Sequence, residues 1–165
     1  MNVRIRDAQP SDHEFLARGN EAMALETERK RLDAATIRRG VAAVFENPAH
    51  GRYFVAEDAA GDAVGQLMIT YEWSDWRNGQ FWWIQSVYVM PAARRRGVFR
   101  ALYDHVDTLA RNTPGVIGLR LYVEVDNVAA RRTYERCGMR DGGYRVMEVD
   151  NSGAIRGANE GDGPC

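Results

Sequence analysis

A glycine set among arginines, directly after an apolar run, is the first group of residues that could do chemistry. Residues 94–100 read RRRGVFR and follow the run FWWIQSVYVM. Helix N-termini already carry partial positive charge, so Arg94, Arg95 and Arg96 are unfavourable at a helix start unless an anion binds there. Main-chain N–H groups at such a turn, with Gly97 allowing close approach, can cradle a phosphate. The segment predicts a phosphate-bearing ligand, with a solvated basic turn as the alternative.

A second segment, NVAARRTYERCG at residues 127–138, carries polar and aromatic groups at helical spacing. Asn127, Ala130 and Tyr134 lie at i, i+3 and i+7, so a helix places them on one face. Taken singly, Asn127 is typical of a helix N-cap and Tyr134 of a half-buried core aromatic. A shared face also allows both to contact one ligand.

Together the two segments resemble the GNAT superfamily of acetyl-CoA-dependent N-acetyltransferases, over about residues 3–149. The family motif Gln/Arg-x-x-Gly-x-Gly/Ala corresponds to RRRGVF, with one departure, because Phe99 stands where the family usually has a small residue. The later family pattern, Asn-x-x-Ala-x-x-x-Tyr-x-x-x-Gly-Phe/Met, is matched without departure by Asn127, Ala130, Tyr134, Gly138 and Met139.

The resemblance implies acetyl-CoA as co-substrate and no metal. It implies a bulge near Val87 and divergence of this strand from the next, so that main-chain groups of Val87 and Val89 bond the acetyl group and the pantetheine arm. Amides of residues 95–100 would hold the pyrophosphate. The expected cofactor-binding residues are Val87, Tyr88, Val89, Arg94, Arg95, Arg96, Gly97, Val98, Phe99, Arg100, Asn127 and Tyr134.

Tyr134 is implied as the general acid that protonates the departing thiolate after direct attack by the amine. A thiol has a pKa of roughly 8.5 and a phenol roughly 10, so Tyr134 stays protonated at neutral pH. Proton transfer is then uphill by about 1.5 pKa units, or roughly 2 kcal/mol, unless the site stabilises the tyrosinate.

A proton acceptor for the amine is less clearly marked. Many family members have a glutamate at the strand position that Trp83 occupies here, and this sequence lacks it. Glu72 is the first candidate, since it ends a predicted strand beside the expected cleft. Gln85 acting through a water, and Glu26 or Glu28, are the others, and each is equally a candidate for an ordinary solvated residue.

Aromatic residues are dense between residues 71 and 83. Strand alternation sends half of FWWIQ into the core, and the other half can line an acceptor pocket. With Glu72 and Asp75 nearby, a small cationic or amphipathic amine is the expected acceptor. The predicted substrate-binding residues are Glu26, Trp73, Trp76, Trp83 and Gln85.

Hydrophobic periodicity predicts a single α/β (α+β) domain over residues 1–149, followed by a flexible tail at residues 150–165. We expect a mixed, mostly antiparallel sheet of six to seven strands and about four helices. The recognisable strands are residues 3–8, 52–58, 63–73, 81–90, 116–125 and 144–149. Helices are expected from a Ser11–Glu14 capping box, with a candidate break at Gly19 and Asn20, from Asp33, from Gly97 to Arg111, and over residues 127–138.

Composition limits the function classes. A net charge of −1 disfavours nucleic-acid binding, and no apolar run is long enough for a membrane span. Cys137 and Cys165 are the only cysteines, which favours a reducing cytoplasm, and the single lysine, Lys30, indicates GC-rich bacterial coding. A small-molecule amine is the expected partner, and a homodimer is an assembly open to the chain. The alternatives are a protein or peptide N-acetyltransferase and a non-catalytic acyl-CoA-binding or partner-binding module.

Overall fold

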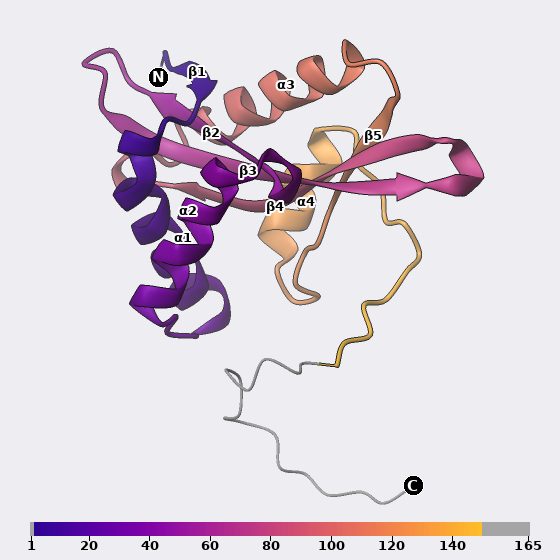
Figure 1. The fold of residues 1–165 in the computed structure, drawn as a ribbon, viewed down its shortest axis with the longest axis horizontal. Coiled ribbons are helices and arrows are strands. Elements are labelled where there is room, and N and C mark those ends of the chain that lie inside the picture. The colour runs from indigo at the N-terminus through magenta and orange to yellow at the C-terminus, as the bar shows by residue number, and fades with distance from the viewer. Residues whose placement is uncertain (1, 150–165) are drawn as a thin grey trace, which may run out of the picture.

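A mixed β-sheet crosses the centre of the protein, seen in a computed structural model that describes residues 2–149 (Figure 1). Its strands lie in the order β1-β2-β3-β4-β5, and neighbours are antiparallel except β4 and β5, which are parallel. This confirms the expected α+β class with a mostly antiparallel sheet. The strands are β1 (Arg4–Asp7), β2 (Arg52–Glu57), β3 (Ala63–Ser74), β4 (Gly79–Val89) and β5 (Val116–Leu121).

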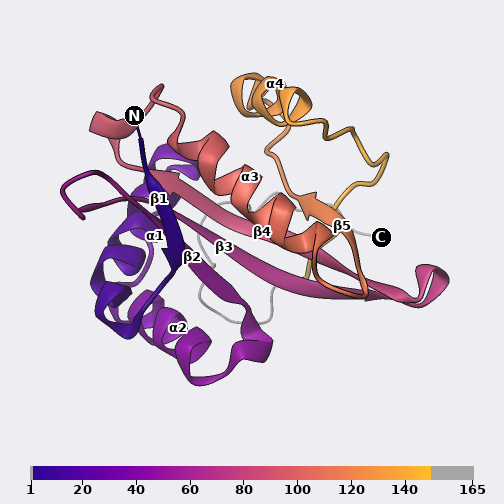
Figure 2. The same ribbon diagram turned by 90° about the horizontal axis from the view of Figure 1, so that it is seen from above.

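Helices cover both faces of the sheet (Figure 2). On one face, α1 (His13–Glu28) and α2 (Ala34–Glu46) pack on a buried cluster formed by Leu16, Ala17, Val41, Tyr53 and Val55. On the other, α3 (Val98–Arg111) packs on a larger cluster that includes Phe54, Leu67, Ile69, Trp82, Ile84, Leu102 and Val106. Because β-strand side chains alternate between faces, this division assigns the regularly paired residues of the strands to one face of the sheet or the other. α4 (Val128–Arg136) follows β5 and contacts α3.

The strand count is smaller than expected, since residues 2–149 contain five strands and not six or seven. The last predicted strand, residues 144–149, does not form, and Met147 there is 92% exposed. An alternating pattern yields a strand only when a neighbouring edge accepts it, and these residues are not paired with β5. β5 itself ends at Leu121, four residues before its predicted end. The expected flexible tail at residues 150–165 lies outside the described residues.

The expected break in α1 at Gly19 and Asn20 is wrong, because both residues serve its packing on the sheet. Gly19 lies where the helix crosses Gln66, and a Cβ there would come within 2.4 Å of the Gln66 Oε1 atom. Asn20 accepts a hydrogen bond from Gln66 Nε2 at 3.0 Å and donates one to the Tyr53 hydroxyl at 3.1 Å. Gly19, a residue type that often ends a helix, here lets α1 approach the Gln66 side chain closely.

The start of α1 also differs from the expected capping box. Pro10–Asp12 form a 3-10 turn, the helix begins at His13, and the Asp12 carboxylate accepts the Gln9 N–H at 2.6 Å. Glu14 instead pairs with Arg38 of α2 at 2.7 Å and with Arg18 at 2.8 Å, which lowers the pKa of Glu14 to about 2. The Asp33 cap of α2 forms as predicted, by accepting the Thr36 N–H.

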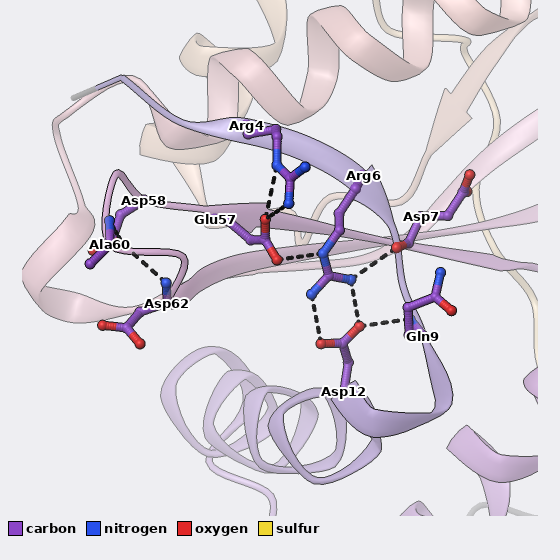
Figure 3. A network of polar contacts seen from close by, with 9 residues as sticks. All are labelled: Arg4, Arg6, Asp7, Gln9, Asp12, Glu57, Asp58, Ala60 and Asp62. Atoms are coloured by element: carbon purple, nitrogen blue, oxygen red, sulfur yellow. Dashed lines mark hydrogen bonds and ion pairs between the residues drawn. The ribbon is translucent and has the colours of Figure 1, made fainter.

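An ion network ties β1 and the start of α1 to β2 (Figure 3). The Arg6 guanidinium bonds the Asp12 carboxylate at 2.6 and 2.9 Å and also bonds Glu57, which Arg4 contacts from the same strand. Both carboxylates are buried. The hydrogen bonds from Arg6 are the main cause that lowers the pKa of Asp12 and of Glu57. Arg6, on the edge strand β1, therefore compensates two buried carboxylates, one at the start of α1 and one on β2.

Replacing Arg6 should change how stability depends on pH. Carboxylates with lowered pKa values stabilise the fold above their unfolded-state values of roughly 4, and this stabilisation is lost as the pH falls through the lower folded-state values. Arg6→Gln should therefore lower the free energy of unfolding at pH 7 and flatten its decline below about pH 4. Urea denaturation between pH 7 and pH 2.5 measures both effects.

Arg111→Gln is the matched control, because Arg111 forms an exposed pair with Asp107 at the far end of α3. It should keep the wild-type pH profile. A parallel decline for wild type and Arg6→Gln would show that Arg6 does not set the acid sensitivity.

Candidate active site

The pairing between β4 and β5 stops halfway along β4. β5 pairs with residues 80–84, and the last pair joins Ile84 to Leu121. At this point β4 also carries a bulge, because Ile69 pairs with Ile84 whereas Met68 pairs with Ser86, which leaves Gln85 as the extra residue. The expected divergence of the strands is present, and the bulge lies two residues before its predicted place near Val87.

The main chain of residues 85–89 presents an open edge on the side where β5 has ended. Met90 donates its N–H to the Val64 carbonyl at 2.9 Å, on the β3 side. Main-chain groups of successive strand residues point in opposite directions, so those of Val87 and Val89 point away from β3. In agreement, the Val89 carbonyl accepts a hydrogen bond from Arg94 Nε at 2.9 Å. The open edge therefore offers main-chain donors and acceptors that no neighbouring strand within residues 2–149 pairs.

The turn after β4 leaves main-chain N–H groups available to an anion. Arg95 and Gly97 adopt positive φ angles of 60° and 84°, and Gly97 is the N-cap of α3 without a side-chain cap. The N–H groups of residues 98–100 have no acceptor within the helix. A Cβ on Gly97 would meet no atom within 4 Å, so a ligand can approach the backbone there. This geometry fits the phosphate cradle predicted for the segment.

Two of the arginine side chains point to other partners. Arg94 pairs with Glu26 of α1 at 2.6 Å, in addition to its bond to the Val89 carbonyl, and Arg100 pairs with Asp104 at 2.8 Å. Glu26, expected at the acceptor site, is thus placed at the end of the open edge. The main-chain amides remain the principal groups for holding an anion in this turn.

Phe99, the departure from the family motif, packs between α3 and α4. Its ring lies 5.7 Å from that of Tyr134 at an interplanar angle of 62°, and 6.2 Å from that of Tyr103. Burial raises the pKa of Tyr134 above its ordinary value, which keeps the phenol protonated at neutral pH. Phe99 therefore forms a wall for Tyr134 in a place where the family usually has a small residue.

Asn127 caps α4, because its Oδ1 accepts the Ala130 N–H at 3.0 Å. The prediction that Asn127 is the N-cap of this helix is therefore confirmed. The Asn127 side-chain amide makes no hydrogen bond to another residue between 2 and 149, and its contact with a cofactor stays a prediction.

Glu72 lies on the α1/α2 face of the sheet and is bound by two donors. Arg120 Nη1 contacts its two carboxylate oxygens at 2.8 and 3.0 Å, and Trp83 Nε1 donates to one of them. A carboxylate that already accepts these bonds is poorly placed to take a proton from an amine. The geometry therefore assigns Glu72 the role of positioning Arg120 and Trp83.

Two residues of this face, Arg120 and Tyr122, were not found by sequence reasoning, whereas Phe81 belongs to the aromatic set from which a pocket lining was expected. The Arg120 guanidinium lies 3.8 Å from the centre of the Phe81 ring, and the Trp83 and Tyr122 rings are 4.3 Å apart. The available signal was the alternation in GLRLY, which places Arg120 and Tyr122 on one face of β5. Their partners on β3 and β4 depend on register, which that alternation does not reveal.

The other predicted acceptor residues are scattered. Gln85 lies on the α1/α2 face beside Thr70, whose hydroxyl is 3.4 Å from Gln85 Oε1, and Trp83 is the residue of β4 that pairs with Thr70. Trp73 and Trp76 lie toward the tip of the β3–β4 hairpin, which projects away from the helices in Figure 1, and Trp76 is 88% exposed. At about 3.3 Å per residue, the hairpin tip is roughly 20 Å from the bulge. The structure therefore does not bring these two tryptophans to the open edge.

Glu28, the remaining candidate base, pairs with Lys30 at 2.8 Å on the surface. Between residues 2 and 149 no cluster of three or more histidine, cysteine, aspartate or glutamate side chains could hold a metal ion. No helix in this part of the chain is long and apolar enough to cross a membrane.

Sequence comparison relates the chain to acetyltransferases. The model of the acetyltransferase (GNAT) family matches residues 15–139. A mycothiol acetyltransferase of Gordonia bronchialis is 32% identical over an alignment of 143 residues, which covers 83% of this chain and 43% of that protein. One from Mycobacterium sp. (strain JLS) is 31% identical over an alignment of 143 residues, with coverage of 84% of this chain and 44% of that protein. The chain thus spans less than half the length of these relatives.

Solved structures show the same fold. A possible acetyltransferase from Clostridium difficile 630 superposes with a TM-score of 0.84 at 39% identity, covering 91% of this chain and 98% of that one. An aminoglycoside N-acetyltransferase in complex with CoA has a TM-score of 0.74 at 14% identity, covering 91% and 95% of the two chains. At that identity the second likeness concerns the fold alone.

Proposed function

The chain belongs to the GNAT family of acetyltransferases, and from this premise we propose that it transfers the acetyl group of acetyl-CoA to a primary amine. The observation that carries the proposal is the open edge of β4 at residues 85–89, which leads directly into the Gly97 turn. A thioester with a long amide-bearing arm and a pyrophosphate needs such a continuous run of main-chain donors and acceptors.

The residues present fit acetyl-CoA. Main-chain groups of Val87 and Val89 would bond the acetyl carbonyl and the pantetheine amides, and the N–H groups of residues 95–100 would hold the pyrophosphate. Arg94 Nε donates to the Val89 carbonyl, and this guanidinium would lie next to the pantetheine arm, where it can also donate to the cofactor. The family's use of acetyl-CoA supports this assignment.

Tyr134 is the proposed general acid. The amine nitrogen attacks the thioester carbonyl, a C–N bond forms, the C–S bond breaks, and the thiolate takes the phenolic proton. The raised pKa of Tyr134 keeps this proton available at neutral pH, although it makes the transfer to sulfur more uphill. The contact with Phe99 holds the ring in place on the α3 side of the open edge.

The amine proton needs a separate acceptor on the opposite side of the open edge. We favour water held beside Gln85, because the bulge turns this exposed side chain to the α1/α2 face next to Thr70. Glu72 is the weaker candidate, since its oxygens accept bonds from Arg120 and Trp83. The acceptor amine would therefore approach from the α1/α2 face while Tyr134 acts from the other.

A small molecule is the proposed acceptor class, and the curated relatives are named for such a compound, mycothiol. Because the chain spans less than half of those proteins, their acceptor is not transferred to it. The alternative acceptor for the same acetyl transfer is an amine of a protein or peptide.

Changing Gly97 should weaken cofactor binding. Gly97→Val puts a branched side chain above the cradle and should lower the affinity for acetyl-CoA at least about tenfold, measured by calorimetric titration. Single Arg→Ala changes at Arg95 or Arg96 should have smaller effects, because the main chain is the principal binding group.

Gly61→Val is the matched control, since Gly61 lies in the β2–β3 turn with a φ of 88°, and a Cβ added there would meet no atom within 4 Å. Both variants should lose similar stability from the strained backbone, and only the Gly97 variant should lose affinity. Unchanged acetyl-CoA affinity in Gly97→Val would remove the turn from the cofactor site.

Removing the Tyr134 hydroxyl should slow chemistry without affecting binding. Tyr134→Phe keeps the ring contact with Phe99, so folding and acetyl-CoA affinity should survive, while the single-turnover rate should fall by at least about 10²-fold. The rate is measured as CoA release with one amine that the wild type acetylates.

Tyr103→Phe is the control variant, because Tyr103 also packs on Phe99 but directs its hydroxyl to the Cys137 carbonyl. It should retain the wild-type rate. Equal rates for wild type and Tyr134→Phe would remove Tyr134 from the mechanism. The absence of CoA release with every amine would instead favour a non-catalytic acyl-CoA-binding module.

A further inference from the structure

We infer that Arg120 binds a carboxylate of the acceptor, so that the acceptor is an amine that also carries an acidic group. The inference rests on the proposed acetyl transfer and specifies which amines the site takes. It follows from three features: the contacts that orient the Arg120 side chain, the N–H groups of its guanidinium that do not bind Glu72, and the position of these N–H groups relative to the open edge of β4.

Arg120 is held in one orientation before any ligand arrives. Its Nη1 donates to both oxygens of Glu72, and its guanidinium carbon lies 3.8 Å from the centre of the Phe81 ring. Trp83 Nε1 binds the same carboxylate from the neighbouring strand. Stacking on an aromatic face and a charge-assisted bond at one end restrict the side chain, so little rotamer entropy is lost when a ligand binds at the other end.

The unused donors of Arg120 have the geometry that a carboxylate requires. A guanidinium carries five N–H groups, and those of Nη1 are directed to Glu72. Nε and Nη2 make no hydrogen bond to another residue between 2 and 149, and the side chain is 29% exposed. The Nε and Nη2 donors lie on one edge of the guanidinium and are parallel, which suits two-point binding of a carboxylate.

The location of Arg120 suits an acceptor molecule. Arg120 of β5 pairs with Trp83 of β4. The next residue pair, Ile84 and Leu121, is the last one between these two strands. It lies on the α1/α2 face, as Gln85 does, and this is the face opposite the α3 cluster. A molecule that places its amine at the open edge therefore passes the Arg120 donors and the stacked rings of Trp83 and Tyr122.

Charge balance explains why this face selects an acidic group and not a second cation. Glu72 could attract a cationic acceptor only if its charge were available, and Arg120 already neutralises it. The groups left to a ligand are N–H donors and aromatic faces. The expectation of a small cationic or amphipathic amine, which was based on Glu72 and Asp75, is narrowed by this inference to an amine that also carries a carboxylate.

Matched acceptors test this selection in wild type. L-Phenylalanine, its carboxamide and 2-phenylethylamine share the ring and the amine, and differ in the acidic group; β-alanine, 4-aminobutyrate and 6-aminohexanoate vary its distance from the amine. CoA release gives kcat and KM for each. At least one carboxylate-bearing amine should be preferred in kcat/KM about tenfold or more over its counterpart without the charge.

Variants assign the preference to Arg120. Arg120→Gln should raise KM for the preferred acceptor about tenfold or more, reduce the preference for that acceptor over the matched amine that lacks the carboxylate, and leave the acetyl-CoA affinity intact. Arg120→Lys should recover part of the loss, because it keeps the charge without the paired donors. The double variant Glu72→Gln/Arg120→Gln should show the same loss as Arg120→Gln, and Arg111→Gln should behave as wild type.

The outcomes separate this inference from the proposed function. Equal kcat/KM for the acids and for their counterparts that lack the carboxylate, or recovery of the wild-type KM in the double variant, would overturn the role of Arg120. If no amine releases CoA, the proposed function fails, and calorimetric titration of the same acids into the protein with CoA decides the inference alone. Binding of an acid that Arg120→Gln abolishes would support it, and binding that is absent or unaffected by the change would overturn it.

Discussion

The end of the pairing between β4 and β5 is the constraint on which the rest of this structure depends. Main-chain N–H and C=O groups need partners, and a strand inside a sheet normally finds them on both sides. Past Ile84 and Leu121, β4 keeps β3 on one side and has no strand of residues 2–149 on the other. The open edge at residues 85–89 is therefore a binding surface made of main chain, whose specificity depends little on the identity of its side chains.

This open edge separates two environments. On the α3 side, Phe99 and Tyr134 form an aromatic wall in which burial keeps the phenol protonated. On the α1/α2 side, the bulge exposes Gln85 beside a charge-balanced pair, Glu72 and Arg120, with Trp83 and Tyr122 stacked next to it. A thioester held between them would meet a proton donor from one face and an amine from the other. Such a division keeps acid and nucleophile apart until the acetyl carbonyl lies between them.

The sequence was most informative where function depends on local chain geometry. The Gly97 turn, the N-cap at Asn127 and the alternation around Trp82 each follow from short-range rules, and the structure has them as expected. Long-range placement was not available from the same rules. The partner of Glu72 depends on the register of three strands, and the distance of Trp76 from the site depends on how far the β3–β4 hairpin extends. The last predicted strand failed for the same reason, since its pattern carries no information about a neighbouring edge.

Amide hydrogen exchange, followed by NMR with and without saturating acetyl-CoA, tests the central claim most directly. If the open edge and the Gly97 turn hold the cofactor, exchange should slow at the N–H groups of Val87, Val89 and residues 98–100, for which residues 2–149 provide no acceptor. Slowed exchange confined to other parts of the sheet, while calorimetry shows that acetyl-CoA is bound, would contradict the account.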